Sequence, residues 1–364
     1  MVGIDCGSYT PEGVNRIADL VAASLGELGA TVERLEHRPA EGEAQLGDLV
    51  IGRLAGDGPR LLLIGHMDTV FDEGTAAARP YRRQGDRAFG PGVSDMKGGL
   101  LAGLHALAVL REAGELPAVT FVANPDEEIG SPFSTPIIRS LVAEHHAALV
   151  LECARANGDI VSARKGIADL ALRIRGRAAH AGVEPEKGRS AIVEAAHQVL
   201  ALTELNGHWP GVTLNVGVIG GGTRPNVVAA NCELQVDLRA ATATAFAEAR
   251  GRVERLAATT HVEGVTTELH QLAGHPPMEK TPPAARLAEL AIAIAAELGF
   301  ELHDTATGGA SDANTTAAAG LATLDGLGPI GGDDHSADEW LDMASVAPRI
   351  ELLATLMQRI GSAL

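Results

Sequence analysis

Short continuous apolar runs alternate with stretches of helical spacing in the first part of the chain. The apolar runs lie at 48–52, 60–64, 118–123 and 147–151. The stretches with helical spacing lie at 10–28, 97–113 and 136–145. Because continuous apolar strands separated by helices are typical of a buried parallel sheet, we predict an α/β domain. Its mostly parallel sheet should carry helices on both faces.

The pattern changes near residue 166, where apolar and polar residues begin to alternate from Ala168 to Arg175. Such alternation indicates a sheet with one solvated face. The segment continues with predicted elements at 190–205 (helix), 212–218 and 231–238 (strands), 242–257 (helix) and 265–272 (strand). This strand-helix-strand-strand-helix-strand order is that of a ferredoxin-like α+β domain.

Prolines at 276, 277, 282 and 283 close this second segment. A strand at 321–324 and helices near 284–298 and 344–360 follow it, with the texture of the first part of the chain. We therefore predict that residues 1–165 and 277–364 form one domain, which is interrupted by a smaller domain at 166–276.

The composition narrows the possible partners. The 364 residues include 29 Lys and Arg against 47 Asp and Glu, so the formal charge is 29 − 47 = −18. This acidity argues against a nucleic-acid partner, because phosphate binding depends on clustered basic residues. Aromatic residues make up only 3% of the chain, so the core should be aliphatic.

Three cysteines lie far apart, at 6, 153 and 232, and form no C-x-x-C pair. A disulfide framework is therefore not indicated. The first residues lack the basic region and long apolar run of a signal peptide, and no uninterrupted apolar stretch approaches membrane-spanning length. We expect a soluble cytoplasmic protein with no membrane partner.

Candidate chemistry gathers where predicted strands end. His66 and Asp68 follow the strand at 60–64, and Asp126, Glu127 and Glu128 follow the strand at 118–123. Taken alone, each group has an alternative: a purely structural role for the first and a solvated acidic turn for the second. Asp95 lies in a glycine-rich loop before a helix, where the alternative is a helix N-cap.

Two further strands show the same feature. The strand at 147–151 runs directly into Glu152, and the strand at 321–324 leads to Asp333, Asp334 and His335. Four strands therefore deliver His or carboxylate side chains at their carboxyl ends, where open α/β sheets form their ligand crevice.

The types of ligand indicate the ion. Imidazoles and carboxylates without thiolates suit Zn²⁺, with Co²⁺ or Mn²⁺ as substitutes. A site with two metal ions would use one carboxylate as a bridge and leave another free to carry a proton. Such a site can activate water at neutral pH, because it lowers the pKa of the water that it binds.

Five motifs together resemble one family. They read Gly-His-Met-Asp-Thr-Val at 65–70, Gly-Val-Ser-Asp-Met-Lys-Gly-Gly at 92–99, Asp-Glu-Glu-Ile-Gly-Ser at 126–131, Leu-Glu-Cys-Ala-Arg at 151–155 and Asp-His-Ser at 334–336. In order and over essentially the whole chain, they resemble the di-zinc peptidases and deacylases. That family includes glutamate carboxypeptidase, acetylornithine deacetylase, succinyl-diaminopimelate desuccinylase and aminoacylase, and the glutamate carboxypeptidase branch is the most similar.

The resemblance implies a role for each motif. One zinc ion would be held by His66, Asp95 and Glu152, and the other by Asp95, Glu128 and His335, with Asp95 as the bridge. Asp68 would orient His66. Glu127 would take a proton from the metal-bridging water as it attacks an amide carbonyl and pass it to the leaving nitrogen.

For the inserted domain, the resemblance implies a lid and a homodimer contact. His180 would reach the active site of the partner subunit and help to stabilise the oxyanion; a capping or surface histidine is the alternative. Asn226 would contact substrate, Gly309 would lie in a substrate-lining loop, and Arg239 would bind a carboxylate. A solvated arginine at the end of a strand is the alternative for Arg239.

One position departs from the glutamate carboxypeptidases, which would offer an Arg just before a Pro at the end of the inserted domain. This chain has Gly274, His275 and Pro276 there, so His275 becomes the substrate-binding candidate and a preference for C-terminal glutamate is in doubt. The expected activity is zinc-dependent removal of a C-terminal amino acid from a peptide or N-acyl substrate. An N-acyl-amino-acid deacylase or a dipeptidase with the same site is the alternative.

Other enzyme classes find little support. No G-x-S-x-G motif occurs, which argues against a serine hydrolase. A G-x-G-x-x-G match at 326–331 contains a proline and lacks a following helix, so it indicates a loop. Cys153 beside Glu152 is interpreted as a buried structural thiol.

Overall fold

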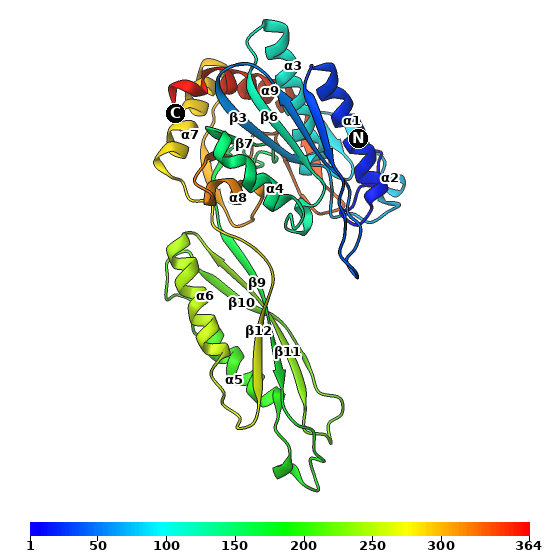
Figure 1. Cartoon of the computed structure of the whole chain (residues 1–364), viewed down its shortest axis with the longest axis vertical. Coiled ribbons are helices and arrows are strands. Elements are labelled where there is room, and N and C mark those ends of the chain that lie inside the picture. The colour runs from blue at the N-terminus through cyan, green and yellow to red at the C-terminus, as the bar shows by residue number, and fades with distance from the viewer. The chain divides into compact units, whose positions relative to one another are not determined.

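The protein is described here by a computed structural model that covers all residues 1–364 (Figure 1). The chain forms two compact units. Unit 1 contains residues 1–163, 280–307 and 311–364, and unit 2 contains residues 164–279 and 308–310. Unit 2 is therefore an insertion in the chain of unit 1.

Unit 1 is built on a six-stranded sheet with the strand order β1-β2-β6-β3-β7-β14. Its strands are β1 (Thr31–Leu35), β2 (Leu49–Leu54), β6 (Pro117–Asn124), β3 (Asp57–His66), β7 (Ala147–Val150) and β14 (Ala322–Leu324). The four strands β6, β3, β7 and β14 are mutually parallel, whereas β2 runs antiparallel to β6 and β1 antiparallel to β2. The mostly parallel sheet predicted from the apolar runs is confirmed.

Helices cover both faces of this sheet, as predicted (Figure 1). One face packs against α1 (Pro11–Glu27), α3 (Gly99–Ala113), α7 (Pro282–Glu297) and α9 (Met343–Arg359). The other face packs against α4 (Ser134–Leu141) and α8 (Asp312–Ala318). The main core is aliphatic, and Phe121 is the one aromatic residue among its fully buried members.

The first helix shows how local sequence sets these elements. Pro11 occupies the first turn of α1, where its missing N–H costs nothing, and buried residues recur at helical spacing at 14, 17, 18, 21 and 25. Gly29, with φ of 76°, follows the helix in the left-handed region. Thr10 occupies the N-cap position, but its side chain makes no capping hydrogen bond.

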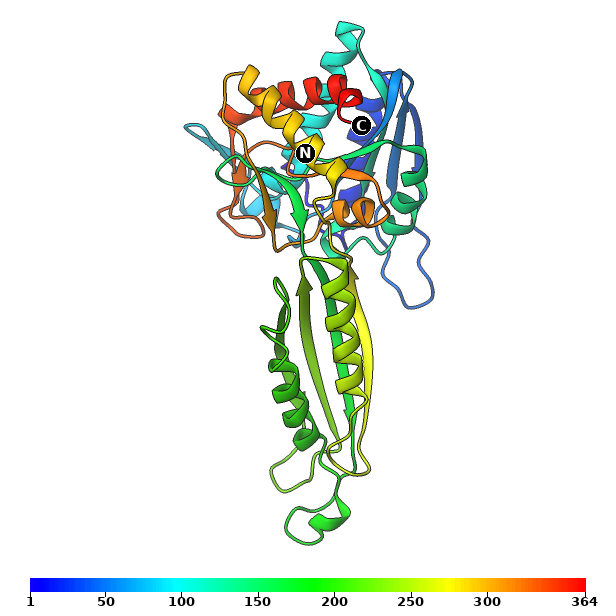
Figure 2. The ribbon, with the colours of Figure 1, turned by 90° about the vertical axis from the view of Figure 1, so that its left-hand side faces the viewer.

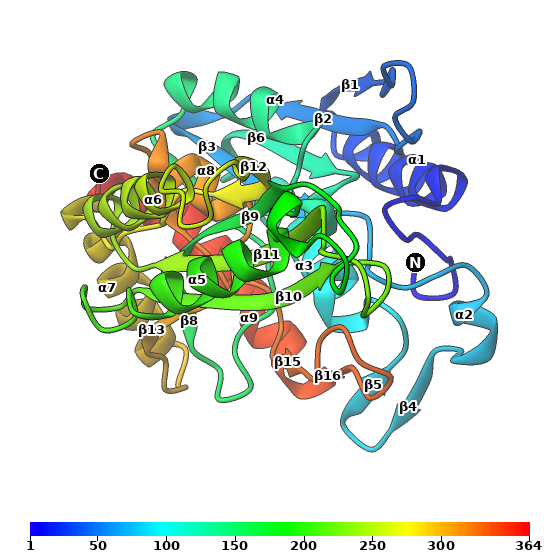
Figure 3. The same ribbon diagram turned by 90° about the horizontal axis from the view of Figure 1, so that it is seen from below.

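Smaller elements complete unit 1. A four-stranded sheet has the order β15-β16-β5-β4, and Figure 3 shows its strands side by side. The remaining bounds are α2 (Thr75–Ala78), β4 (Arg82–Gln84), β5 (Arg87–Phe89), β8 (Ile160–Arg164), β13 (Asp304–Thr307), β15 (Gly331–Gly332) and β16 (Trp340–Asp342).

The stretch Val93–Ala113, which contains α3, is long and apolar enough to cross a membrane by length and composition alone. However, 67% of its apolar window is buried in the fold. Its residues Leu100, Leu104, Leu107 and Leu110 belong to the main core. This stretch is therefore accounted for as a core helix of unit 1.

Unit 2 contains an antiparallel sheet of order β10-β11-β9-β12 with two helices on one face (Figure 2). Its elements are β9 (Gly166–Arg175), α5 (Ala191–Thr203), β10 (Thr213–Gly221), β11 (Asn231–Ala240), α6 (Ala243–Ala257) and β12 (Thr266–His275). Alternate residues of β9 at 168, 170, 172 and 174 are buried under the helices. The two ends of the unit lie side by side, because Arg164 and Met278 exchange backbone hydrogen bonds of 2.9 and 3.0 Å.

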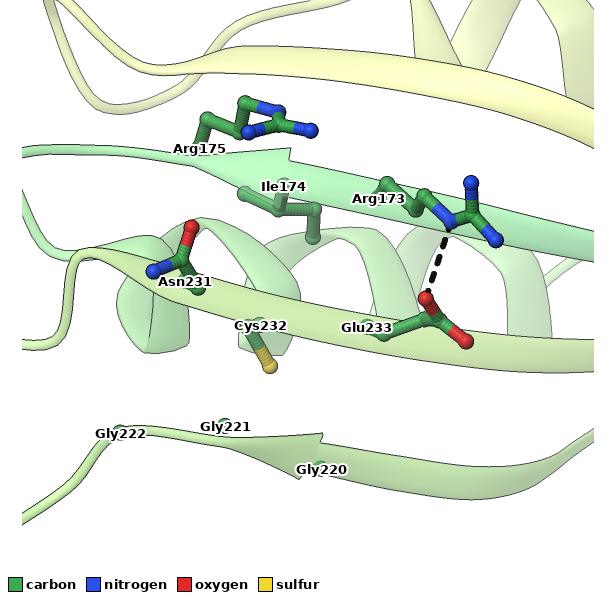
Figure 4. Close-up of a pocket in the computed structure, with 9 residues that line it drawn as sticks. All are labelled: Arg173, Ile174, Arg175, Gly220, Gly221, Gly222, Asn231, Cys232 and Glu233. Atoms are coloured by element: carbon green, nitrogen blue, oxygen red, sulfur yellow. Dashed lines mark hydrogen bonds and ion pairs between the residues drawn. The ribbon is translucent and has the colours of Figure 1, made fainter.

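A hollow of about 260 Å³ lies along β9, β11 and β10 (Figure 4). On one side it is lined by three glycines without side chains, Gly220 and Gly221 of β10 and the following Gly222. Above them, Arg173 of β9 and Glu233 of β11 form an ion pair of 3.1 Å between neighbouring strands.

Candidate metal and catalytic site

Parallel strands of unit 1 bring the predicted chemical groups to one edge of the sheet. His66 is the last residue of β3, which lies between β6 and β7. Glu127 and Glu128 follow β6, and Glu152 follows β7. Because the carboxyl ends of parallel strands meet at one edge, residues far apart in the sequence become neighbours.

Asp95 lies between the two histidines. His66 Nε2 is 3.0 Å from Asp95 Oδ1, and His335 Nε2 is 3.1 Å from Asp95 Oδ2. The same nitrogen of His335 lies 3.1 Å from Glu128 Oε2, and His66 Nε2 lies 3.6 Å from Glu152 Oε1. All five residues predicted as metal ligands therefore form one cluster within unit 1.

The loop that carries Asp95 is held by two buried charges of opposite sign. Glu339 accepts the backbone N–H groups of Gly92, Ser94 and Asp95 at 2.9, 2.8 and 3.1 Å. Lys97 Nζ donates to the carbonyl oxygens of Ile4 and Pro91 at 3.1 and 3.0 Å. Asp95 does not cap α3, whose N-cap position is held by Gly98.

Asp68 connects the end of β3 to the acidic turn after β6. Its fully buried carboxylate lies 3.3 Å from His66 Nδ1 and accepts a 2.6 Å hydrogen bond from Ser8 Oγ. It also accepts the backbone N–H groups of Glu127 and Glu128, both at 3.2 Å. One carboxylate thus fixes the ring of His66 and the turn that presents the two glutamates.

The side chains of the cluster are of the kinds that bind a metal ion. Two overlapping groups share His66: one adds Asp95 and Glu128, and the other adds Glu127 and Glu152. Within each group, the ligand atoms lie within 4.8 Å of one another. The ion pairs of Asp95 and Glu128 are with histidines, and Glu128 Oε1 is buried without a hydrogen-bond partner. Buried carboxylates are stable when paired or when they coordinate a metal, so these residues suit metal binding.

The electrostatics of the cluster follow from burial and close opposite charges. Burial by itself would lower the pKa of His66, but Glu152, Asp68 and Asp95 raise it well above its ordinary value. Hydrogen bonds to Asp95 and Glu128 raise the pKa of His335 to about 10. In return, these histidines lower the pKa of Asp95, despite its burial.

Glu127 has the properties of a proton carrier. Burial raises its pKa well above the ordinary glutamate value, and the nearby charges of Glu152 and Glu128 raise it further, against the opposing effect of His66. A carboxyl group with a raised pKa can both take and return a proton near neutral pH.

The loop after β14 places His335 through unusual backbone geometry. Asp333 and His335 have φ values of 56° and 62°, in the left-handed region that residues other than glycine rarely adopt. Trp340 Nε1 donates to Asp333 Oδ2 at 3.0 Å and helps to hold this loop. Backbone strain of this kind is concentrated at functional sites.

In unit 2, His180 and Asn226 lie together at one end of the sheet. His180 pairs with Val227 in a backbone bridge, and the N–H of Ala181 donates to the carbonyl of Asn226 at 3.0 Å. His180 lies in the loop that follows β9, and Asn226 lies in the loop that precedes β11. The side chains of both residues are exposed.

Arg239 and His275 lie at the opposite end of the same sheet, where both pair with Ile167 of β9. The Arg239 guanidinium contacts both carboxylate oxygens of Asp237 at 3.0 to 3.1 Å and donates to the carbonyl of Gly308 at 2.9 Å. Gly309 belongs to the same unit and accepts from Arg164 at 3.2 Å. Burial lowers the pKa of His275.

Sequence patterns did not single out three residues that support the cluster. Ser8 precedes α1, Lys97 lies in the glycine-rich loop, and Glu339 immediately precedes β16. In the sequence, the available signal for Glu339 was an acid directly before the apolar pair Trp340 and Leu341. The structure shows that this acid is buried. Spacing alone does not distinguish such an acid from a solvated one.

Residues 62–359 match the model of the peptidase family M20/M25/M40. The chain belongs to this family. Carboxypeptidase G2 of Pseudomonas sp. (strain RS-16) is 31% identical over 368 residues, which is the whole of this chain and 88% of that enzyme. Acetylornithine deacetylase of Myxococcus xanthus is 29% identical over 66% of this chain and 64% of its own length.

Two solved structures in the comparison share the fold of this M20 chain. The aminopeptidase PepT from Bacillus cereus has a TM-score of 0.77 at 24% identity, over 99% of this chain and 95% of that one. An M20 metallo-carboxypeptidase, Sso-CP2 from Sulfolobus solfataricus, has a TM-score of 0.74 at 16% identity, over 99% and 97%. Family and fold together identify this protein as a hydrolase with a metallopeptidase-type cluster.

Proposed function

We propose that this M20 protein is a zinc-dependent hydrolase that cleaves the amide bond to a C-terminal amino acid. The observation that carries the proposal is the position of Glu127, a half-buried acid beside a cluster of two histidines and three further carboxylates. The similarity to carboxypeptidase G2 over the whole chain supports the same class of reaction. Co²⁺ or Mn²⁺ would be substitutes for Zn²⁺.

The proposed reaction assigns a role to each group. His66, Asp95 and Glu152 would hold one zinc ion, and Asp95, Glu128 and His335 the other. Bound zinc supplies Lewis acidity toward the substrate carbonyl and toward water. Glu127 accepts the proton of the attacking water and then donates it to the leaving nitrogen, while Asp68 keeps the His66 ring and the glutamate turn in position.

Metal analysis and a substrate panel test this function. The protein should contain two zinc ions per subunit and should hydrolyse N-acyl amino acids or dipeptides until a chelator removes the metal. Glu127→Gln should keep its zinc and lose turnover by at least about 100-fold, as expected for loss of a general base. Undiminished hydrolysis by metal-free protein would refute the proposal.

An N-acyl-amino-acid deacylase or a dipeptidase is the second candidate. His275 stands where an arginine would bind a glutamate carboxylate, and an M20 deacetylase is among the relatives. The same panel separates these activities, because a deacylase prefers small acyl groups whereas a dipeptidase requires a free amino terminus.

We also propose a cytoplasmic location. The free cysteines at 6, 153 and 232, all buried and unpaired, agree with it.

We also propose that unit 2 mediates a homodimer. β10 is an edge strand, and its residues Val218 and Ile219 are 51% and 57% exposed. On the neighbouring helix α5, Ile192, Val193 and Leu200 are also exposed. An open strand edge beside an exposed apolar helix surface is the kind of surface that pairs with a second chain.

The positions of the substrate-binding candidates support this dimer. His180 and Asn226 lie at one end of the unit 2 sheet, and Arg239 and His275 lie at the other. The ten residues of β9 between them span roughly 30 Å at about 3.3 Å per residue. A small substrate cannot contact both ends of one sheet, so we propose that His180 and Asn226 serve the site of the partner subunit.

Hybrid dimers test the shared site. A chain with His180→Ala and a chain with Glu127→Gln should each be inactive in homodimers. In a heterodimer, one site receives an intact Glu127 and an intact His180, so up to about half of a dimer's activity should return. Absence of rescue in purified heterodimers would refute the contribution of His180 in trans.

A further inference from the structure

The two candidate glutamates lie in a short loop that one buried acid contacts at both ends. This acidic loop, residues 124–131, runs from Asn124, the last residue of β6, to Ser131, which precedes α4. Asp312, the first residue of α8, accepts a 2.6 Å hydrogen bond from Ser131 Oγ with its Oδ1 atom. Its Oδ2 atom accepts a hydrogen bond from the side-chain amide of Asn124. The two oxygens of one carboxylate therefore join the ends of the loop that carries Glu127 and Glu128.

Both ends of the acidic loop are fixed parts of unit 1. Asn124 is fully buried and pairs with His66 in the register of β6 with β3. Ser131 is also fully buried, and its φ of 54° lies in the left-handed region that residues other than glycine rarely adopt. Its backbone N–H donates to the carbonyl of Asp126 at 2.8 Å. Such backbone geometry persists only where surrounding contacts hold it, and the hydrogen bond to Asp312 is one of those contacts.

Asp312 is held in place independently of the acidic loop. The preceding residue, Ser311, caps α8: its Oγ atom accepts the backbone N–H of Ala313 at 3.1 Å and donates to the buried Asp325 at 2.6 Å. Helix α8 also packs against α4, the helix that follows the acidic loop (Figure 1). Asp312 is only 1% exposed, so it is too buried to contact a substrate. Any effect on a reaction must pass through the residues that it contacts.

The carboxamide of Asn124 uses only one of its two ends. Asn124 Oδ1 is buried without a hydrogen-bond partner. Because a carboxylate has no hydrogen to donate, only the NH₂ end of Asn124 can face Asp312. If an amide replaced this acid, a half-turn of Asn124 would let its oxygen accept a hydrogen bond instead. Burial raises the pKa of Asp312 to about 7, so an uncharged side chain is compatible with this place near neutral pH.

We infer that Asp312 is a positioning residue, which sets the places of Glu127 and Glu128 by holding both ends of the acidic loop. The inference rests on the proposed hydrolase function, in which Glu127 carries the proton and Glu128 holds a zinc ion. Asp68 binds the backbone N–H groups of the same two glutamates, so their positions are set from two directions. A displacement of about 1 Å in a catalytic group can cost about 100-fold in rate, so Asp312 should act on kcat rather than on KM.

Two substitutions of Asp312 separate its hydrogen bonds from its charge. Asp312→Asn keeps an acceptor for Ser131 and offers an amide to a rotated Asn124, so kcat of the zinc-loaded protein should stay within about threefold of the unmodified value. Asp312→Leu has a similar volume but makes neither contact. Its kcat should fall about 100-fold, while its KM changes less than about twofold. An equal fall in both variants would overturn the inference.

Ser131→Ala is a milder variant, because it removes only one hydroxyl group. It should lower kcat about tenfold in the otherwise unmodified protein, as expected for a group that supports a catalytic residue. In the Asp312→Leu background, the same change should cost less than about twofold, because the partner of the hydroxyl is already absent. Equal losses in both backgrounds would show that Ser131 does not act through Asp312.

Thr316→Val is the matched control on the same helix. Thr316 is fully buried in α8, and its hydroxyl donates to the carbonyl of Ala313 at 3.1 Å and lies 3.0 Å from Thr323 Oγ1. The substitution therefore removes buried hydrogen bonds of α8 that do not reach the acidic loop. It should lower the melting temperature and leave kcat unchanged. A fall in kcat as large as that of Ser131→Ala would mean that any weakening of α8 has this effect, and would overturn the inference.

Hydrogen exchange separates this inference from the proposed function. In metal-free protein, backbone N–H groups of residues 126–131 should exchange about tenfold faster in Ser131→Ala than in the unmodified protein, because local opening becomes easier. Exchange in the other elements of unit 1 should not change. Unchanged exchange in the acidic loop would overturn the positioning role, whether or not the protein hydrolyses any amide. Faster exchange in a protein that hydrolyses none would support the contact and refute the proposed function alone.

Discussion

The backbone N–H of Asp95, the residue between the two histidines, donates to the buried carboxylate of Glu339 at 3.1 Å. Glu339 takes two more N–H groups from the same loop and is 1% exposed. Asp95 is thus positioned by a residue 244 places later in the sequence. The geometry of the cluster depends on this acid as well as on the ligands themselves.

We predict that Glu339→Gln weakens metal binding by about 10- to 100-fold, the usual effect of removing a group that supports metal ligands. The amide nitrogen of Gln would face a backbone N–H where an oxygen now accepts it. Titration of metal-free protein with Zn²⁺ or Co²⁺ measures the change. The variant should lose metal affinity while it remains folded, as its melting temperature shows.

Glu194→Gln is the matched control. Glu194 is also fully buried and accepts the backbone N–H groups of His261 and Val262 at 2.8 and 2.7 Å, but it lies in unit 2. It should lower the melting temperature without altering metal affinity. Equal metal affinity in both variants would contradict the positioning role of Glu339.

Metal binding should release protons, because a metal ligand must be a neutral imidazole. In the metal-free protein, His335 has a pKa of about 10 and is therefore protonated at neutral pH. The apparent affinity for zinc should rise with pH up to about 10, by about tenfold per pH unit for each proton released. Proton release measured in weakly buffered solution gives the number of protons, and binding without any release would contradict this assignment.

The same shift has a consequence for metal-free protein. Because the folded pKa of His335 is raised above its ordinary value of 6.5, its contacts with Asp95 and Glu128 stabilise the fold fully below pH 6.5. That contribution declines as the pH rises through about 10. Metal-free His335→Ala should therefore show a smaller loss of stability between pH 7 and pH 10 than the unmodified protein does.

Asp68→Asn should reduce kcat strongly while leaving the chain folded. Asn keeps one acceptor oxygen for the glutamate turn, but its amide group cannot stabilise the His66 ring as a carboxylate does. We expect a loss of about 10- to 100-fold in metal affinity or kcat. Ser8→Ala removes only one hydrogen bond to Asp68 and should cost less than Asp68→Asn in the same assays. The reverse order would contradict this view.

Two glycines with opposite surroundings give a stability prediction. A Cβ at Gly99 would lie 1.8 Å from the carbonyl oxygen of Leu151, so Gly99→Ala should push α3 away from the end of β7. We expect destabilisation of about 3 kcal/mol or more. Gly26 in α1 has open space around its Cβ position, so Gly26→Ala should stabilise the fold by up to about 1 kcal/mol. Urea unfolding of both variants measures the difference.

The sequence predicted the central sheet well because buried parallel strands leave a simple signal. The runs at 60–64, 118–123 and 147–151 are apolar apart from Arg60 and Thr120, and histidine or carboxylate side chains follow each of them. That conjunction located the strands and the candidate ligands together. The roles of those ligands remain predictions until metal is measured.

Other features left weaker signals. β1 has only partly buried or exposed residues and pairs antiparallel with β2, so its pattern resembles a loop. The small sheet that includes β16 has strands of two or three residues, too short for any periodicity. The partner of a buried acid such as Glu339 is set by tertiary contact, which local spacing does not encode.

The paired ends of unit 2 imply that the insertion is modular. Since Arg164 and Met278 are bonded to each other, residues 164–279 begin and end at the same point in space, and unit 1 has its own core. A chain in which a short turn replaces this segment would still contain every candidate metal ligand. A gene could thus have gained or exchanged the segment without disturbing the ion-binding scaffold, and each unit could evolve at its own rate.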